Sequence, residues 1–110
     1  MPTAYKVLGQ VAPSATTATA LYTVPAATEA VISTVVVANR SASDATYRIS
    51  VRPDGETLAD KHYIAYDVTV GASDSTTITL GITMNATDVL EVYASTADLS
   101  FNAFGSEITA

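Results

Sequence analysis

Few residues of this chain are suited to catalysis. His62 is the only histidine among the 110 residues, so a serine hydrolase triad would have to use it as the base. No serine lies in a Gly-x-Ser-x-Gly sequence, and His62 follows Asp60 and Lys61 at the start of a predicted strand. We therefore expect a histidine at a strand edge near solvent, and we expect that the chain is not an enzyme.

Acidic residues are more numerous, and most of them fall in predicted turns. Asp54 and Glu56 could form a carboxylate pair for acid–base chemistry, but turn carboxylates usually accept backbone hydrogen bonds. A calcium site would draw on Asp44, Asp54, Asp74 or Asp88, yet no Asp-x-Asp-x-Asp spacing occurs. Cysteine is absent, which excludes disulfides and cysteine-bound zinc or iron–sulfur clusters. We expect no metal and no cofactor.

A group of arginines and tyrosines is the best candidate for a binding surface. Arg48 and Arg52 share one face of a predicted strand, and Arg40 ends the strand before it. These arginines either pair with nearby carboxylates or form a docking patch for a partner's carboxylates. Tyrosines on a sheet face extend such a patch, pair across strands or bind sugars. The candidate interface residues are Arg40, Arg48, Arg52, Tyr63, Tyr93 and Val36.

Composition narrows the classes of partner. The net charge is -6 and the pI is about 4.3, which argues against a nucleic-acid partner. The longest apolar run, residues 35–38, is far too short to cross a membrane, and residues 1–6 do not resemble a signal peptide. We expect synthesis in the cytoplasm and no membrane partner. Only 15% of the residues are charged, which suits a surface covered by other protein subunits.

The elements that position these side chains are predicted to be β-strands, because apolar and polar residues alternate with a period of two. In residues 47–52, Tyr47, Ile49 and Val51 alternate with the two arginines. Strands are expected over residues 5–10, 19–24, 30–39, 47–52, 62–70, 75–80, 89–95 and 99–104. The fold class is therefore all-β, an antiparallel two-sheet sandwich of the jelly-roll or immunoglobulin-like type with about eight short strands.

Residues 1–110 are predicted to form a single sandwich domain. Residues 1–18 are either an extended arm that adds a strand to a neighbour or an ordinary first strand, and we favour the ordinary strand.

Two predicted strands are apolar on both faces. In residues 30–39, Val31, Val35 and Val37 are expected on one face and Ile32 with Val36 on the other. Residues 89–95 are likewise expected to have apolar side chains on both faces. Something should therefore cover the second face. The simplest cover is a further copy in a homo-oligomer, and the alternative is a partly closed barrel.

Several segments resemble small virion structural proteins of tailed bacteriophages, those of marine cyanophages most of all. They are residues 21–25, 30–40, 45–53, 61–67 and 92–105. The resemblance covers nearly the whole chain and consists of strand and turn sequences, not catalytic motifs. It implies a β-sandwich module present in multiple copies on a capsid, neck, tail or fibre.

The leading expectation is thus a non-enzymatic virion protein that decorates or cements a capsid, or acts as a head–tail accessory, by contacting other virion proteins. The alternative is a tail or fibre module that binds host-surface glycans, for which Tyr63 and Tyr93 are the motivation. A hydrolase built on His62 ranks last.

Overall fold

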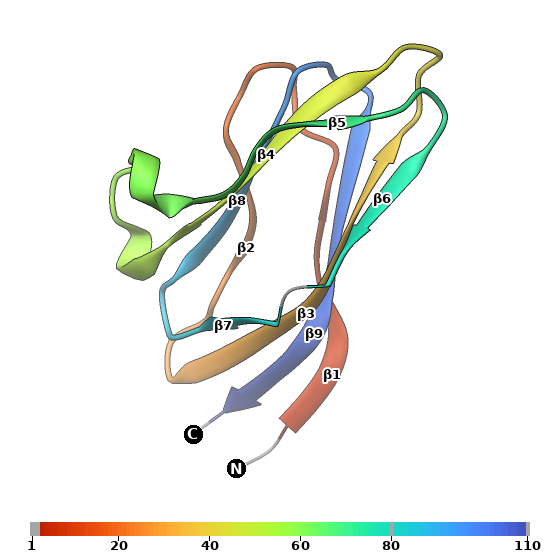
Figure 1. Cartoon of the computed structure of the whole chain (residues 1–110). Helices are drawn as coiled ribbons and strands as arrows, with labels where there is room; N and C mark the ends of the chain where they lie inside the picture. Colours follow the sequence, from red (N-terminus) through yellow and green to blue (C-terminus); the bar gives the residue numbers. More distant parts are fainter. Residues whose placement is uncertain (1–2, 80, 110) are drawn as a thin grey trace.

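The protein is a sandwich of two antiparallel β-sheets (Figure 1). The computed structural model describes residues 3–79 and 81–109, and within them the chain forms nine strands. The strands are β1 (Thr3–Val11), β2 (Thr19–Thr23), β3 (Thr28–Asn39), β4 (Ala45–Arg52), β5 (Tyr63–Val70), β6 (Ser75–Ile78), β7 (Ile82–Met84), β8 (Val89–Ala94) and β9 (Leu99–Thr109). The predicted all-β two-sheet sandwich is confirmed.

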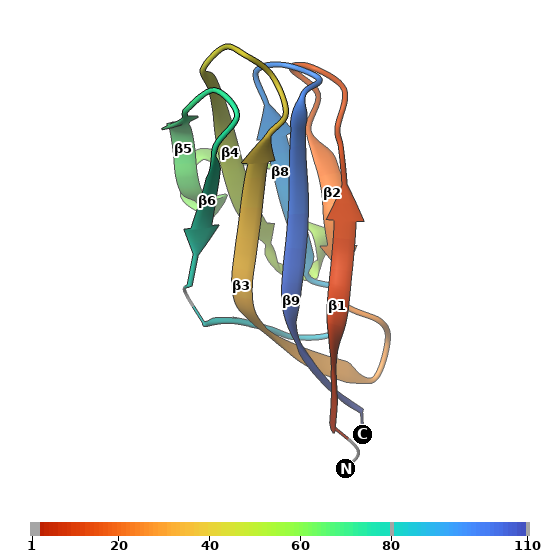
Figure 2. The same ribbon diagram turned by 90° about the vertical axis from the view of Figure 1, so that its right-hand side faces the viewer.

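The strand order identifies the sandwich as a jelly roll. One sheet, sheet A, has the order β1-β9-β3-β6, with β7 also paired to β3, and the other, sheet B, has the order β2-β8-β4-β5. Strands from the two halves of the chain pair in sequence: β1 with β9, β2 with β8, β3 with β7 and β6, and β4 with β5. Such pairing is that of one long antiparallel ribbon wrapped into two layers, as in a jelly roll. Figure 2 shows sheet A in front of sheet B.

The core lies between the sheets and is closed by large side chains. Tyr47 and Phe101 come from opposite sheets, are at most 2% exposed, and meet edge to face with ring centroids 6.2 Å apart. Ile49, Leu90 and Leu99 are equally well buried around them. Burial of this apolar surface is the main force that holds the two sheets together.

Seven of the predicted strands have counterparts that begin close to their expected starts, although β9 continues to Thr109 and not only to residue 104, and the exception is the segment after β6. The strand expected over residues 75–80 ends at Ile78, Leu80 lies outside the described residues, and β7 follows at Ile82–Met84. β6 and β7 pair with the two halves of β3, so together they take the place of one strand.

β3 departs from strict alternation because a bulge interrupts it. Its register to β9 shifts between Ile32 and Thr34. Ile32, Val35 and Val37 are therefore buried, while Val31 and Val36 are only half-buried. The predicted assignment, with Val31 beside Val35 and Ile32 beside Val36, is wrong, because an extra residue turns the rest of a strand over.

The bulge is matched by a glycine on the neighbouring strand. A Cβ at Gly105 would lie 1.9 Å from the carbonyl oxygen of Val31, so only glycine allows β3 and β9 to approach here. β1 shifts register at the same level, between Val7 and Gly9. All three long strands of sheet A thus bend together, and their lower halves extend past β2 and β8 (Figure 1).

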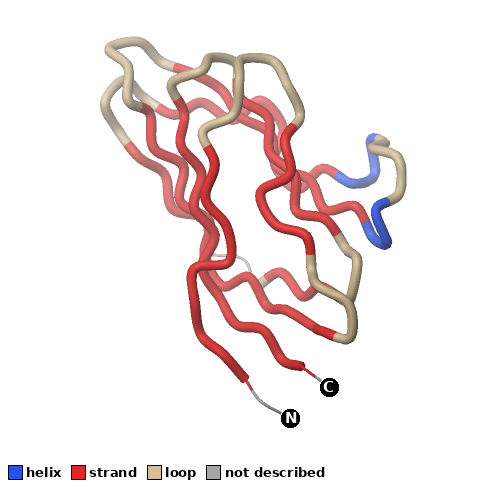
Figure 3. Tube along the Cα trace, turned by 180° about the vertical axis from the view of Figure 1, so that it is seen from behind, coloured by secondary structure: helices blue, strands red, loops and turns tan. Residues whose placement is uncertain are grey.

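The largest excursion from the sandwich is the segment 53–62, which we call the strap. It contains two short 3₁₀ turns, η1 (Pro53–Gly55) and η2 (Asp60–His62), and projects from the side of sheet B (Figure 3). The two ends of the described chain lie near each other at the opposite end from the β3–β4 turn (Figures 1 and 3). Within the described residues, no helix is long and apolar enough to cross a membrane.

Candidate interaction surfaces

The outer face of sheet B centres on Arg48. Its guanidinium carbon lies 4.2 Å from the ring centroid of Tyr66 and 4.4 Å from that of Tyr93. Its Nε donates to Oδ1 of Asp67 at 2.7 Å and its Nη2 to Oδ2 at 3.3 Å. This hydrogen-bonded carboxylate raises the pKa of Arg48 further above its usual range, so the guanidinium is always charged. Tyr63 meets Tyr66 edge to face at 4.9 Å.

A bulge in β5 brings these partners to Arg48. Tyr47 pairs with Val68 and Ile49 pairs with Ala65, so Tyr66 and Asp67 together stand opposite Arg48. Asp67 has a φ of 52°, a left-handed conformation that aspartate tolerates better than most residues.

Strict alternation counted back from buried Val70 would place Tyr66 on the inner face of β5, yet Tyr66 is 56% exposed. The bulge is the reason, since two residues opposite one break the period of two.

Arg52 has a structural role beside this cluster. Its Nε donates to Oε2 of Glu91 at 3.0 Å, and its Nη1 donates to the carbonyl oxygens of Gly55 and Glu56. Arg52 thus ties the strap to β8. Of the two interpretations weighed for this arginine, the structure shows the pairing with a carboxylate.

His62 holds the other end of the strap. It is 5% exposed, its Nδ1 accepts the backbone N–H of Ala59 at 2.9 Å, and its Nε2 lies 3.2 Å from Oε1 of Glu56. Because Nδ1 is an acceptor here, the proton of the neutral ring is on Nε2 and points at the carboxylate. The expectation of a histidine near solvent is wrong, because the strap folds over the ring.

A hollow of about 300 Å³ lies between the strap and the Arg48 cluster. Leu58 of the strap, Tyr63 and Tyr93 line it together with Arg48, and Ser50 and Glu91 line it as well. Ser50 and Glu91 are 3% and 7% exposed. A largely apolar wall with a few converging polar groups is typical of a small-molecule site.

The outer face of sheet A has a different character, because few of its side chains are charged: Glu29 points outward near the start of β3, and Lys6 borders the face from β1. The uncharged residues that point away from the core on β1, β3 and β9 include Tyr5, Val7, Val31, Thr34, Val36, Ala38, Ser100, Asn102, Phe104 and Ser106. Tyr5, Val7 and Phe104 are 86%, 49% and 37% exposed and border a shallow hollow of about 500 Å³. We call these ten residues the A face.

The six candidate interface residues do not form one surface. Arg48, Tyr63 and Tyr93 gather around the hollow on sheet B, with Arg52 beside them. Val36 lies on the A face, on the other side of the molecule. Arg40 follows β3 and donates to Oγ of Ser100 at 2.9 Å and to the carbonyl of Ala97 at 3.0 Å, so it closes the end of the A face.

The turn carboxylates accept hydrogen bonds from loop residues, as their positions in the sequence predict. Oδ1 and Oδ2 of Asp88 accept the backbone N–H groups of Asp54 and Asn85, both at 2.8 Å. Asp44 accepts the N–H of Ala72, and Asp54 accepts the hydroxyl of Thr87. Within the described chain, no three His, Cys, Asp or Glu side chains gather as they would around a metal ion.

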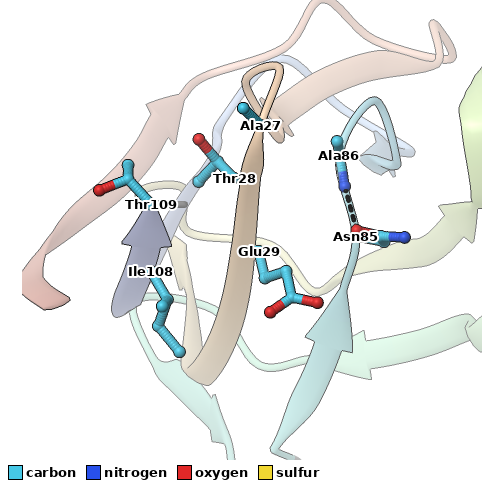
Figure 4. Close-up of a pocket in the computed structure, with 7 residues that line it drawn as sticks. All are labelled: Ala27, Thr28, Glu29, Asn85, Ala86, Ile108 and Thr109. Carbon is cyan, nitrogen blue, oxygen red and sulfur yellow. Dashed lines mark hydrogen bonds between the residues drawn. The ribbon is translucent and has the colours of Figure 1, made fainter. Parts of the chain in front are cut away.

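A second hollow, of about 290 Å³, lies among the β2–β3 turn, the β7–β8 turn and the end of β9 (Figure 4). Its lining is Ala27, Thr28, Glu29, Asn85, Ala86, Ile108 and Thr109. Figure 4 shows the side chain of Asn85 accepting a hydrogen bond from the backbone of Ala86. Glu29 is its single charged group and it has no aromatic wall, so it is the weaker candidate site.

A buried carboxylate links the two sheets below the core. Glu107 of β9 accepts the hydroxyl of Tyr22 at 2.5 Å and pairs with Lys6 at 2.5 Å. Hydrogen bonds from Lys6 and Tyr22 lower the pKa of Glu107, and burial together with Glu107 raises the pKa of Tyr22. The spacing of Lys6, Tyr22 and Glu107 along the sequence does not reveal that their side chains meet.

Comparison with known proteins yields structural neighbours only. No family model and no curated protein matches the sequence. The structure is similar to two solved structures of a pentameric capsid protein isolated from metagenomic phage sequences, at TM-scores of 0.42 and 0.36 and 18% sequence identity. The alignments cover 96% of this chain and only 64% and 65% of theirs, so the chain spans less than two thirds of those proteins.

This likeness assigns neither a family nor a function to the chain. The two neighbours are phage capsid proteins. Nothing in them bears on marine cyanophages.

Proposed function

We propose that the protein is a non-enzymatic structural component of a phage virion, a capsid decoration or cement protein or a head–tail accessory subunit. The A face carries this proposal. It presents exposed Tyr5, Val7 and Phe104 among hydroxyl and amide side chains, and few charged residues, such as Lys6 and Glu29, lie beside it. Jelly rolls occur among viral capsid proteins, and the sequence resemblance to virion proteins agrees with this role.

The physics of the A face suits contact with another protein. Burying a charge without a partner is costly, so a surface without charges can be covered at little electrostatic expense. Apolar side chains supply the gain in free energy, about 25 cal/mol for each Å² removed from water. Interface cores are likewise depleted in charged residues and enriched in aromatic ones.

The proposed partners are capsid or tail subunits, together with further copies of this chain as a homo-oligomer or in multiple copies on the particle. The edge strand β1 brings Tyr5 and Val7 to the border of sheet A, where the backbone of a neighbour could pair with it. The proposed location is the virion, after synthesis in the host cytoplasm.

Mass spectrometry of purified virions tests this proposal. We expect several copies per particle for the natural chain, and loss of incorporation for Val7→Glu and Phe104→Glu, which place a charge on the A face. Ile64→Glu is the matched control, because Ile64 is similarly exposed, at 44%, but lies on β5 of sheet B. Virions without the protein, or full incorporation of both A-face variants, would contradict the proposal.

A second candidate is a tail or fibre module that binds host-surface glycans. The tyrosines gathered around Arg48 favour it, because aromatic rings beside polar groups can hold a sugar, and jelly rolls also occur among lectins. A glycan array probed with the purified chain tests this candidate. Binding to a defined set of glycans would support it, and an array without any binding would count against it.

A further inference from the structure

The hollow on sheet B has walls suited to the ring of a small polar ligand. Tyr63 and Tyr93 line it from β5 and β8, and Leu58 lines it from the strap. Its volume, about 300 Å³, is at the lower end of the range for small-molecule sites. The hollow is thus large enough for one or two sugar rings and too small for an extended ligand.

Arg48 is fixed in place before any ligand arrives. The rings of Tyr66 and Tyr93 lie 4.2 and 4.4 Å from its guanidinium carbon, and Asp67 accepts hydrogen bonds from its Nε and Nη2. The hydrogen bonds among the described residues do not use its Nη1. A group held in this way loses little conformational entropy when it donates to a ligand.

Glu91 offers the complementary acceptor. Its Oε2 accepts from Arg52, whereas its Oε1 has no hydrogen-bond partner among the described residues. No buried side-chain oxygen or nitrogen in the described structure lacks a partner, so Oε1 must be reached by solvent. A hydroxyl group in the hollow can donate to it.

The charges around the hollow cancel in pairs. Arg48 pairs with Asp67 at 2.7 Å and Arg52 pairs with Glu91 at 3.0 Å. A charged ligand would therefore find no unmatched opposite charge. The chemistry instead favours an uncharged ligand with hydroxyl groups and at least one apolar face.

We propose that this hollow binds one uncharged pyranose ring. The C–H face of the sugar packs on Tyr63 and Tyr93, one hydroxyl accepts from Nη1 of Arg48, and another donates to Oε1 of Glu91. This inference deepens the glycan-binding candidate and rests on it, whereas the role proposed for the A face is independent of it.

Titration of the full chain with methyl glycosides of neutral hexoses, followed by NMR, tests the site. We expect saturation transfer to the sugar and shifts of the amide signals of Arg48, Tyr63, Glu91 and Tyr93. Tyr93→Leu should weaken binding about tenfold, because an aromatic ring contact is lost while the apolar bulk remains. Tyr5→Leu is the matched control on the other sheet and should bind as the natural chain does.

Charge selectivity is tested with a matched pair of ligands, methyl glucoside and methyl glucuronide. The proposal predicts that the added carboxylate brings no gain in affinity. A glucuronide that binds tenfold more tightly would overturn the uncharged class of ligand, and the absence of binding by every neutral glycoside would overturn the site.

Glu91→Gln is a second variant that keeps the shape of the hollow and tests the acceptor without removing a ring. Weaker binding to it supports the proposal, and unchanged binding to both Glu91→Gln and Tyr93→Leu overturns it. Glycan binding on an array that persists in both variants would keep the glycan candidate while placing its site elsewhere. None of these outcomes changes the virion test of the A face.

Discussion

Arg48 and Tyr93 are directly paired neighbours on β4 and β8, and the guanidinium carbon of one lies 4.4 Å from the ring centroid of the other. This cross-strand pair belongs to the regular ladder. The bulge in β5 then adds Tyr66 and Asp67 to the other side of Arg48. A regular pairing and an irregular one thus combine to build the centre of the sheet B surface.

Two replacements of Asp67 distinguish the contribution of its charge to stability from the contribution of its backbone conformation. Asp67→Asn keeps a residue that tolerates the φ of 52°, so we expect little change in melting temperature, because exposed ion pairs contribute little to stability. Asp67→Ala should be less stable than Asp67→Asn by roughly 1 kcal/mol, because alanine is strained in this conformation. Urea denaturation of the two variants measures the difference, and equal stabilities would refute the strain.

Gly105 is predicted to tolerate no side chain, and Gly9 is in the same position, since its Cβ would lie 2.0 Å from the carbonyl oxygen of Leu21. Gly105→Ala places a Cβ 1.9 Å from the carbonyl oxygen of Val31, so β3 and β9 must move apart. We expect a loss of about 3 kcal/mol or more, comparable to other severe packing defects, or no folding at all. Gly71→Ala is the control, since its Cβ would meet nothing closer than 3.8 Å. A thermal melt that shows similar stability for both variants would disprove the close approach.

Glu107 predicts a dependence of stability on pH. Its pKa is lowered by hydrogen bonds from Lys6 and Tyr22, so its contribution is complete above the ordinary value of 4.5 and is lost as the pH falls through the lowered pKa. Glu107→Gln should lose roughly 1–2 kcal/mol at neutral pH, and this deficit should shrink progressively below pH 4.5.

Exposed Glu29 provides the control for this pH dependence. Glu29→Gln should follow the pH profile of the natural chain. Unfolding in urea at a series of pH values makes the comparison, and a Glu107→Gln deficit that stays constant into strong acid would contradict the assigned pairing.

His62 is predicted to hold the strap closed. His62→Ala removes the acceptor for the N–H of Ala59, so the strap should open more often and its amides should exchange faster with deuterium. Lys61→Ala is the control, because the Lys61 side chain is 73% exposed and its Nζ lies 3.7 Å from Oε1 of Glu56, too far for a hydrogen bond. Exchange in residues 56–62 that is equally slow in both variants would show that the histidine is dispensable.

The alternation of apolar and polar residues was enough to predict the all-β sandwich and most strand positions. A period of two that recurs in many segments is typical of β-strands. It could not predict the bulges at Ser33 and at Tyr66 and Asp67, since a bulge leaves composition and spacing unchanged and only reverses the faces that follow. The arginine and tyrosine cluster was therefore predicted in part, without Tyr66 and Asp67.

Contacts between residues far apart in the sequence could not be predicted from the sequence. Glu107 meets Tyr22 across 85 residues of chain, and only the wrapped ribbon brings them together. The burial of His62 likewise depends on how the strap, residues 53–62, folds, and that short segment has no strong periodicity from which to predict it. Local chemistry within single strands was predictable, and chemistry shared between elements was not.

The central claim is that the A face is covered by another protein in a virion. Cryo-electron microscopy of particles from the source phage tests it most directly. We expect density for this jelly roll in multiple copies, with Tyr5, Val7 and Phe104 buried against a neighbouring subunit. A particle that lacks this density, or one that leaves the A face open to solvent in every copy, would contradict it.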